Sequence, residues 1–93
     1  MYFHFILLSF IFVQPIVSRE CSIQGECINS NHISTIIADS LEQCLVDCAI
    51  APNCKFSTFN SVNHECKLFI DCIEIDMSCT ECRTNGRRCV DSK

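Results

Sequence analysis

The distribution of cysteine along the chain is its most constraining feature. All ten cysteines of the 93-residue chain lie between Cys21 and Cys89, and the first 20 residues contain none. Many cysteines in a short chain are typical of a disulfide-stapled domain that folds in an oxidising compartment. The sequence therefore predicts a leader without cysteine, followed by a small disulfide-rich domain.

Residues 1–18 have the pattern of a secretory signal peptide. An apolar run from Phe5 to Val13 is followed by a polar, proline-containing break and by the small Ser18, after which we place the cleavage. The run is shorter than the roughly 20 residues that a membrane-spanning helix needs, and an uncleaved anchor is the alternative. We expect a secreted, extracellular protein with one domain at residues 19–93 and no stable membrane insertion after cleavage.

The segment after the leader is poor in large apolar side chains. Its aromatic residues are Phe56, Phe59 and Phe69. A domain of this size rarely buries enough apolar surface to fold without cross-links, and each disulfide typically contributes about 2–4 kcal/mol. The formal net charge of −4 argues against a nucleic-acid partner.

Three strands are predicted in the middle of the chain. Residues 33–37 form a β-branched run, and residues 54–59 and 65–70 are joined by a turn-forming segment. Strand alternation places Cys54, Phe56 and Thr58 on one face of the second strand and Phe59 on the other.

A helix is predicted between the first and second of these strands. Asp39 or Ser40 caps it, with Glu42 or Gln43 three positions later closing a capping box, and Pro52 lies just beyond its end. Its buried face is predicted to contain Leu41, Cys44, Leu45, Cys48 and Ala49.

The two ends of the domain are predicted to be irregular. Residues 19–31 are polar and turn-rich, and the chain after Asp71 is a cysteine-rich tail. Asn85 and Gly86 suggest a tight turn displaying basic side chains. The candidate contact patch for an anionic partner consists of Arg83, Arg87 and Arg88, with Lys93 nearby. A solvated loop is the alternative interpretation.

The segment from Ser40 to Asn60, continued by Cys66-Lys67-Leu68-Phe69, contains a distinctive pattern. It has two cysteines four residues apart on a helix, a third in the following turn, an aromatic-bearing strand and a Cys-x-Leu strand. This pattern resembles the PAN/apple domain family. The resemblance implies a disulfide-rich α+β fold in which one helix packs on a short antiparallel sheet. It also implies the pairs Cys44–Cys66 and Cys48–Cys54.

The resemblance leaves six outer cysteines to pair among themselves. They are Cys21, Cys27, Cys72, Cys79, Cys82 and Cys89. Six cysteines allow 15 connectivities, and the sequence does not choose among them. Apple-type members add a bridge between the chain ends, which here would join Cys21 or Cys27 to the tail. We take Cys21–Cys89 as a trial assignment.

Catalytic, metal-binding and cofactor-binding residues are not expected. Cys79-Thr80-Glu81-Cys82 is a C-x-x-C motif, for which a redox pair or half of a zinc site is the alternative to a structural cystine. His32 and His64 lie in polar, turn-like sequence and are predicted to be surface residues. A Cys–His catalytic pair would need a free thiol, and an even number of cysteines leaves no obvious odd one.

The function that the resemblance implies is contact with another macromolecule. PAN and apple domains mediate protein–protein or protein–carbohydrate contacts, so we expect a non-catalytic binding module with an extracellular protein or glycan as partner. A cysteine-rich secreted inhibitor or toxin-like peptide acting on an extracellular protein is the alternative. Such scaffolds usually expose a reactive loop or a dense basic face, and this acidic chain shows neither clearly. An enzyme would require a free thiol or a metal.

Overall fold

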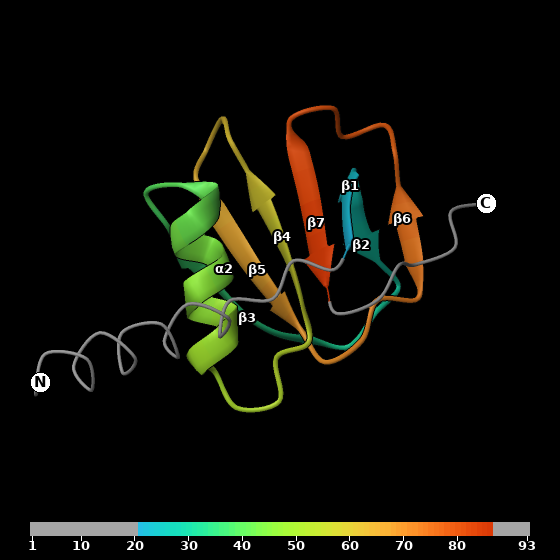
Figure 1. Cartoon of the computed structure of the whole chain (residues 1–93). Coiled ribbons are helices and arrows are strands. Elements are labelled where there is room, and N and C mark those ends of the chain that lie inside the picture. Colours follow the sequence, from blue (N-terminus) through green and yellow to red (C-terminus); the bar gives the residue numbers. More distant parts are fainter. Residues whose placement is uncertain (1–20, 87–93) are drawn as a thin grey trace, which may run out of the picture.

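A five-stranded antiparallel sheet is the centre of the computed structural model, which describes residues 21–86 (Figure 1). In chain order the elements are β1 (Cys21–Gln24), β2 (Glu26–Ile28), β3 (His32–Ile37), α2 (Leu41–Ile50), β4 (Phe56–Asn60), β5 (Glu65–Phe69), β6 (Glu74–Asp76) and β7 (Cys82–Gly86). The sheet has the strand order β1-β7-β4-β5-β3, and β2 pairs with β6 in a separate ribbon. The predicted signal peptide, residues 1–18, lies outside the described residues.

The two ends of helix α2 are set by the residues that flank it. Ser40 is the N-cap, and its side-chain oxygen accepts a hydrogen bond from the backbone N–H of Gln43. The Gln43 side chain donates to Asp47 Oδ1 at 2.9 Å. At the other end Ala51 has an extended backbone, and its N–H donates to the carbonyl of Asp47. Pro52 follows directly, where it cannot continue the helix.

The first core cluster lies between α2 and the sheet face that the helix covers. Its buried members are Ala38, Cys44, Cys54, Phe59, Cys66 and Leu68. Leu41 and Cys48 of the predicted helical face pack at its margin, while Ala49 is exposed. This arrangement of one helix on an antiparallel sheet confirms the predicted α+β fold class.

The second core cluster covers the opposite face of the sheet. Its buried members are Cys27, Phe56, Phe69, Cys72 and Ile75. Cys27 of β2 is disulfide-bonded to Cys72, so the bridge ties the ribbon to the segment that leaves β5. The sheet therefore carries the helix on one face and the β2–β6 ribbon on the other.

A chain of hydrogen bonds fastens the ribbon to the sheet. Thr84 Oγ1 donates to the carbonyl of Gly25 at 2.9 Å, so its single proton is committed. Thr58 must then donate in the 2.7 Å contact between the two hydroxyls, and Thr58 Oγ1 in turn accepts from the N–H of Cys27. Both threonines are buried, so these bonds replace water for a segment that turns sharply at Gly25. Gly25 has a φ of +123°, and a Cβ there would lie 2.9 Å from the carbonyl oxygen of Asp76.

The ends of the described chain are strands, contrary to the prediction. Residues 21–24 and 26–28 form β1 and β2, and the tail contributes β6 and the internal strand β7. Each of these strands pairs with a segment far away in the sequence, as in the pairing of Cys21 with Gly86. Short polar strands of this kind carry little local signal, because their partners decide their conformation.

Two further predictions about side-chain placement were wrong. Asn85 and Gly86 lie within β7 and are buried, not in a displayed turn. Gly86 is covered by the ring of Phe56, which a Cβ at this position would strike. Cys54 precedes β4 and belongs to the helix-side cluster, whereas Phe56 belongs to the other. The strand begins only after Asn53, whose φ is +67°.

Within the described residues, no helix has the length and apolar character needed to cross a membrane.

Candidate binding groove

A groove with one polar and one more apolar part lies on the sheet face opposite α2, along the margin of the ribbon. It consists of two adjoining hollows that share Glu26 and Lys67. The first hollow is lined by Glu26, Thr58, Asn60, Asn63, Glu65, Lys67 and Cys82. The second is lined by Glu26, Cys27, Ile28, Asn29, His32, Thr35, Lys67 and Phe69. Strands β2, β3, β4 and β5 thus all contribute to it.

An ion pair divides the groove into its two hollows. Lys67 Nζ on β5 lies 3.5 Å from Glu26 Oε2 on β2, and their side chains are 36% and 26% exposed. A pair this open to water contributes little to stability. Its ammonium and carboxylate therefore remain available to exchange hydrogen bonds with a ligand.

One end of the groove carries an aromatic surface. The exposed ring of His32 lies edge-on to Phe69, with ring centroids 5.5 Å apart. His32 Nε2 is 2.8 Å from Thr35 Oγ1, which holds the imidazole beside the strand. This end offers an exposed ring next to a hydroxyl.

The other end is formed by the turn between β4 and β5, where side-chain amides are held in fixed positions. Asn60 Oδ1 accepts from the backbone N–H groups of Val62 and Asn63. Asn63 Oδ1 accepts from the N–H of Glu65. Both amide oxygens accept hydrogen bonds within the turn, and the Nδ2 groups are not used there. Asn60 directs Nδ2 toward the sulfur of Cys82 at 3.8 Å.

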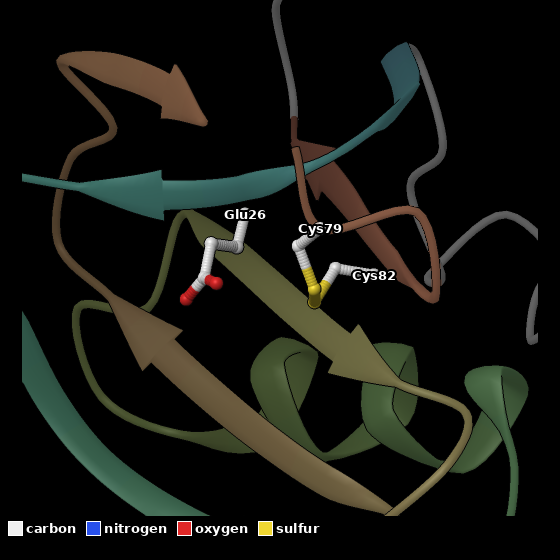
Figure 2. A group of neighbouring side chains, drawn as sticks. All are labelled: Glu26, Cys79 and Cys82. Atoms are coloured by element: carbon white, nitrogen blue, oxygen red, sulfur yellow. A yellow bond between two sulfur atoms is a disulfide. The ribbon is translucent and has the colours of Figure 1, made fainter. Parts of the chain in front are cut away.

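The C-x-x-C motif lies beside this end of the groove. Figure 2 shows Glu26 next to Cys79 and Cys82, and the ligand atoms of the three residues lie within 4.8 Å of one another. The two cysteines form a disulfide. Disulfide sulfurs are not thiolates, and thiolates are what zinc binds. In this oxidised form the group is a cross-link with a neighbouring carboxylate.

The other residues singled out in the sequence lie away from the groove. His64 is exposed, with its ring 6.0 Å from that of Phe59. Arg83 donates to Ser22 Oγ of β1 at 3.0 Å. It lines a hollow with Leu41 and Phe59 on the helix side of the sheet. The remaining members of the candidate basic patch, Arg87 and Arg88, lie outside the described residues, as does Lys93.

The described disulfides are Cys27–Cys72, Cys44–Cys66, Cys48–Cys54 and Cys79–Cys82. The second and third are the pairs that the family resemblance implies, and the other two lie among the six outer cysteines. Cys21 is also disulfide-bonded. Because Cys89 lies outside the described residues, Cys21–Cys89 stays a prediction.

Comparison with known proteins agrees with this architecture. Residues 21–75, more than half of the chain, match the family model of the PAN domain. The chain belongs to the PAN domain family. No curated protein and no solved structure matches it significantly. The match covers β1 to β5 with α2 and ends within β6, whereas the internal strand β7 lies beyond it.

The groove was not predicted from the sequence, although part of its signal was present. The predicted third strand places Glu65, Lys67 and Phe69 on a common face by alternation. Glu26 gave no such signal, because residues 19–31 were expected to be irregular. Only the pairing of β2 with β6 brings its carboxylate across to Lys67.

Proposed function

We propose that the protein is a secreted, non-catalytic binding module whose PAN domain holds a neutral saccharide in the groove. The observation that supports this most directly is the lining of the groove. Hydrogen-bonding side chains stand on both sides of the Glu26–Lys67 pair, and an exposed imidazole ring closes one end. The family makes protein or carbohydrate contacts, and this lining favours carbohydrate.

The chemistry of the lining suits a sugar better than a protein. A saccharide presents many hydroxyl groups, which both donate and accept, and the groove offers carboxylate, ammonium, amide and hydroxyl partners. The first hollow has few of the apolar and aromatic side chains that are typical of the core of a protein–protein interface. The exposed ring of His32 adds a flat surface against which the C–H face of a sugar can pack.

The charge of the groove indicates a neutral ligand. Two carboxylates, Glu26 and Glu65, face one ammonium, that of Lys67. A sulfated chain would meet net repulsion there, in line with the net charge of −4 of the whole chain.

Secretion and the absence of catalysis are parts of the same proposal. Four disulfides within residues 21–86 are typical of folding in an oxidising compartment. None of the cysteines in this range is free to act as a nucleophile. We expect the mature protein to begin at residue 19, after removal of residues 1–18, which N-terminal sequencing of the secreted product would test.

The binding experiment compares two lysine variants of the secreted protein on an array of immobilised neutral and sulfated oligosaccharides. Lys67→Met removes the ammonium at the centre of the groove but keeps the length of the side chain. Lys55→Met makes the same change at an exposed residue that does not line the groove. We expect saturable binding to neutral glycans, weakened about tenfold or more by Lys67→Met, the loss of one charge-assisted hydrogen bond, and unchanged by Lys55→Met.

Other outcomes separate the parts of the proposal. Binding only to sulfated glycans, or equal loss in both variants, would overturn the groove assignment. Binding to an extracellular protein without glycan binding would keep the module but refute the saccharide. Potent inhibition of a protease or channel at equimolar protein would favour the inhibitor or toxin-like alternative.

A further inference from the structure

The outer edge of β3 is a second exposed feature of the fold, besides the groove. β3 is the last strand of the sheet and pairs with β5 alone among residues 21–86. Exposed strand edges are normally protected by lysine, proline, an inward charge or a β-bulge. The six residues His32–Ile37 contain neither lysine nor proline, and their β-branched members favour an extended conformation. The pairing of β3 with β5 shifts register between His32 and Ser34 and is regular from Ser34 to Ile37. This regular part of the edge is suited to accept another strand.

The direction of the unpaired backbone groups follows from the register. Ile36 pairs with Cys66, and the same series continues to Ala38, whose N–H donates to the carbonyl of His64. Residues 36 and 38 therefore point their backbone groups toward β5. By alternation, Thr35 and Ile37 point theirs away from the sheet.

We propose that this edge pairs with the β3 edge of a second copy of the chain, giving a two-fold symmetric dimer with a continuous sheet. In the antiparallel register centred on Thr35, the two Thr35 residues face each other and exchange both backbone hydrogen bonds. Ile37 then lies opposite Ile33 of the second copy, the residue at which the pairing of β3 with β5 shifts register. This register also keeps the groove-side residues of both copies on one face of the sheet, because directly opposed residues share a face.

The composition of the strand favours a second copy over another partner. A two-fold interface must be self-complementary, and like charges opposite one another would oppose it. His32–Ile37 has no acidic residue, lysine or arginine, although the chain as a whole has a net charge of −4. It therefore meets its own copy without charge repulsion and offers no charged group to a different, charged segment. Ile33 and Ile37, which are 37% and 70% exposed, would cover each other across the axis.

The dimer has a consequence for binding that rests on the proposed function. Thr35 lines the groove and lies at the two-fold axis, so both grooves would open on the same face of the joined sheet. Two sites on one face can engage a repeating saccharide together and raise the apparent affinity. Dimerisation is measured without saccharide, so its failure and the failure of saccharide binding are distinguishable.

The test is sedimentation equilibrium of the secreted protein from micromolar to about 1 mM, a range that suits an interface smaller than the roughly 1,200 Å² of a stable complex. Ile37→Lys places a charge at the edge, and Val62→Lys makes the same type of change in the β4–β5 turn, where Val62 is 76% exposed. We expect concentration-dependent dimers in the wild-type protein and in Val62→Lys. Ile37→Lys should weaken association about tenfold, because the Ile37 contact occurs twice.

Amide hydrogen exchange provides a second measurement that locates the interface. The Thr35 and Ile37 amides point to solvent in one copy and become hydrogen-bonded in the dimer, so their exchange should slow as concentration rises. A protein that stays monomeric up to the highest concentration would overturn the proposal. Association that Ile37→Lys leaves unchanged, or that protects other amides, would overturn the assignment to β3.

Discussion

The helix-bearing half of the molecule and the half built from the chain ends are held together by contacts that span different distances along the sequence. Between α2 and the sheet, the disulfides Cys44–Cys66 and Cys48–Cys54 join residues 22 and 6 positions apart. On the other face, Cys27–Cys72 spans 45 positions, and β1 pairs with β7 across nearly the whole described chain.

The two halves differ in the entropic cost of the loops that their contacts close. Contacts between near neighbours close short loops, whereas the β2–β6 ribbon and the pairing of β1 with β7 must bring distant segments together before any contact forms. In the helix half, the β4–β5 hairpin and the disulfide Cys48–Cys54 close shorter loops than these. The terminal half depends on the sheet being present, and it uses buried hydroxyls as well as apolar side chains to attach to it.

Removal of a disulfide should give the largest difference in the free energy of unfolding between the two halves. Replacing both Cys44 and Cys66 by Ala removes a cross-link that is 0% exposed at each cysteine and closes a 22-residue separation. We expect a loss of about 3–5 kcal/mol in the free energy of unfolding, or failure of secretion. The matched variant replaces Cys79 and Cys82, which close a separation of 3, and should lose about 2 kcal/mol or less.

Secretion yield and urea unfolding, followed by circular dichroism, measure the two losses. Disulfide mapping of the wild-type protein is the control and checks the pairings, including the predicted Cys21–Cys89. An equal loss in the two double variants would contradict the view that burial and the longer closed loop make Cys44–Cys66 the stronger of these two cross-links.

The hydroxyl chain under the ribbon should give the next largest effect. Thr84→Val keeps the shape of the side chain but leaves the carbonyl of Gly25 and the hydroxyl of Thr58 without their partners. The free energy of unfolding should fall by about 1–3 kcal/mol. Thr80→Val, the same change at an exposed residue, should stay within about 0.5 kcal/mol. Comparable urea midpoints for the two variants would show that the ribbon does not depend on these bonds.

The same difference explains which elements could be predicted from the sequence. The cap at Ser40, the helical spacing of Cys44 and Cys48, and the β-branched run of β3 are local patterns, and they predicted the helix and the strand before it. The α+β fold class, with the helix packed on the sheet, was implied by the resemblance to the PAN/apple family. β1, β2, β6 and β7 are three to five residues long and polar. Their conformation is imposed by partners far away in the sequence, as the burial of Asn85 and Gly86 in β7 illustrates.

The groove follows the same rule. Glu65 and Lys67 belong to a predictable strand, whereas Glu26 reaches the groove only through the ribbon. A site assembled across both halves gives no contiguous motif, and the only signal in the sequence was the alternation along β5. The sequence likewise predicted β3 as a strand, but its position at the edge of the sheet is known only from the strand order.

The smallest expected effect concerns the turns, which the two halves also build differently. In the helix half, the neutral amide of Asn60 accepts the N–H groups of the β4–β5 turn. After β6, the carboxylate of Asp76 accepts from the hydroxyl and the backbone N–H of Ser78, and these bonds hold the pKa of Asp76 below its usual value near 3.8. Because the folded-state pKa is lowered, the contribution of Asp76 to stability is present above the unfolded pKa. It is lost as the pH falls through the folded one.

An NMR titration of the Asp76 carboxyl group in the wild-type protein and in Ser78→Ala tests this difference. The variant loses the hydroxyl donor, which is the larger cause of the shift, so its Asp76 pKa should rise toward the usual value. The exposed site makes the effect on global stability too small to follow by unfolding, and the titration reads it directly. Below the pKa of Asp76, the protection factors of the amides after β6, corrected for the intrinsic pH dependence of exchange, should fall, while those of the amides bonded to Asn60 stay the same. An identical Asp76 titration in both proteins would show that Ser78 does not hold this turn.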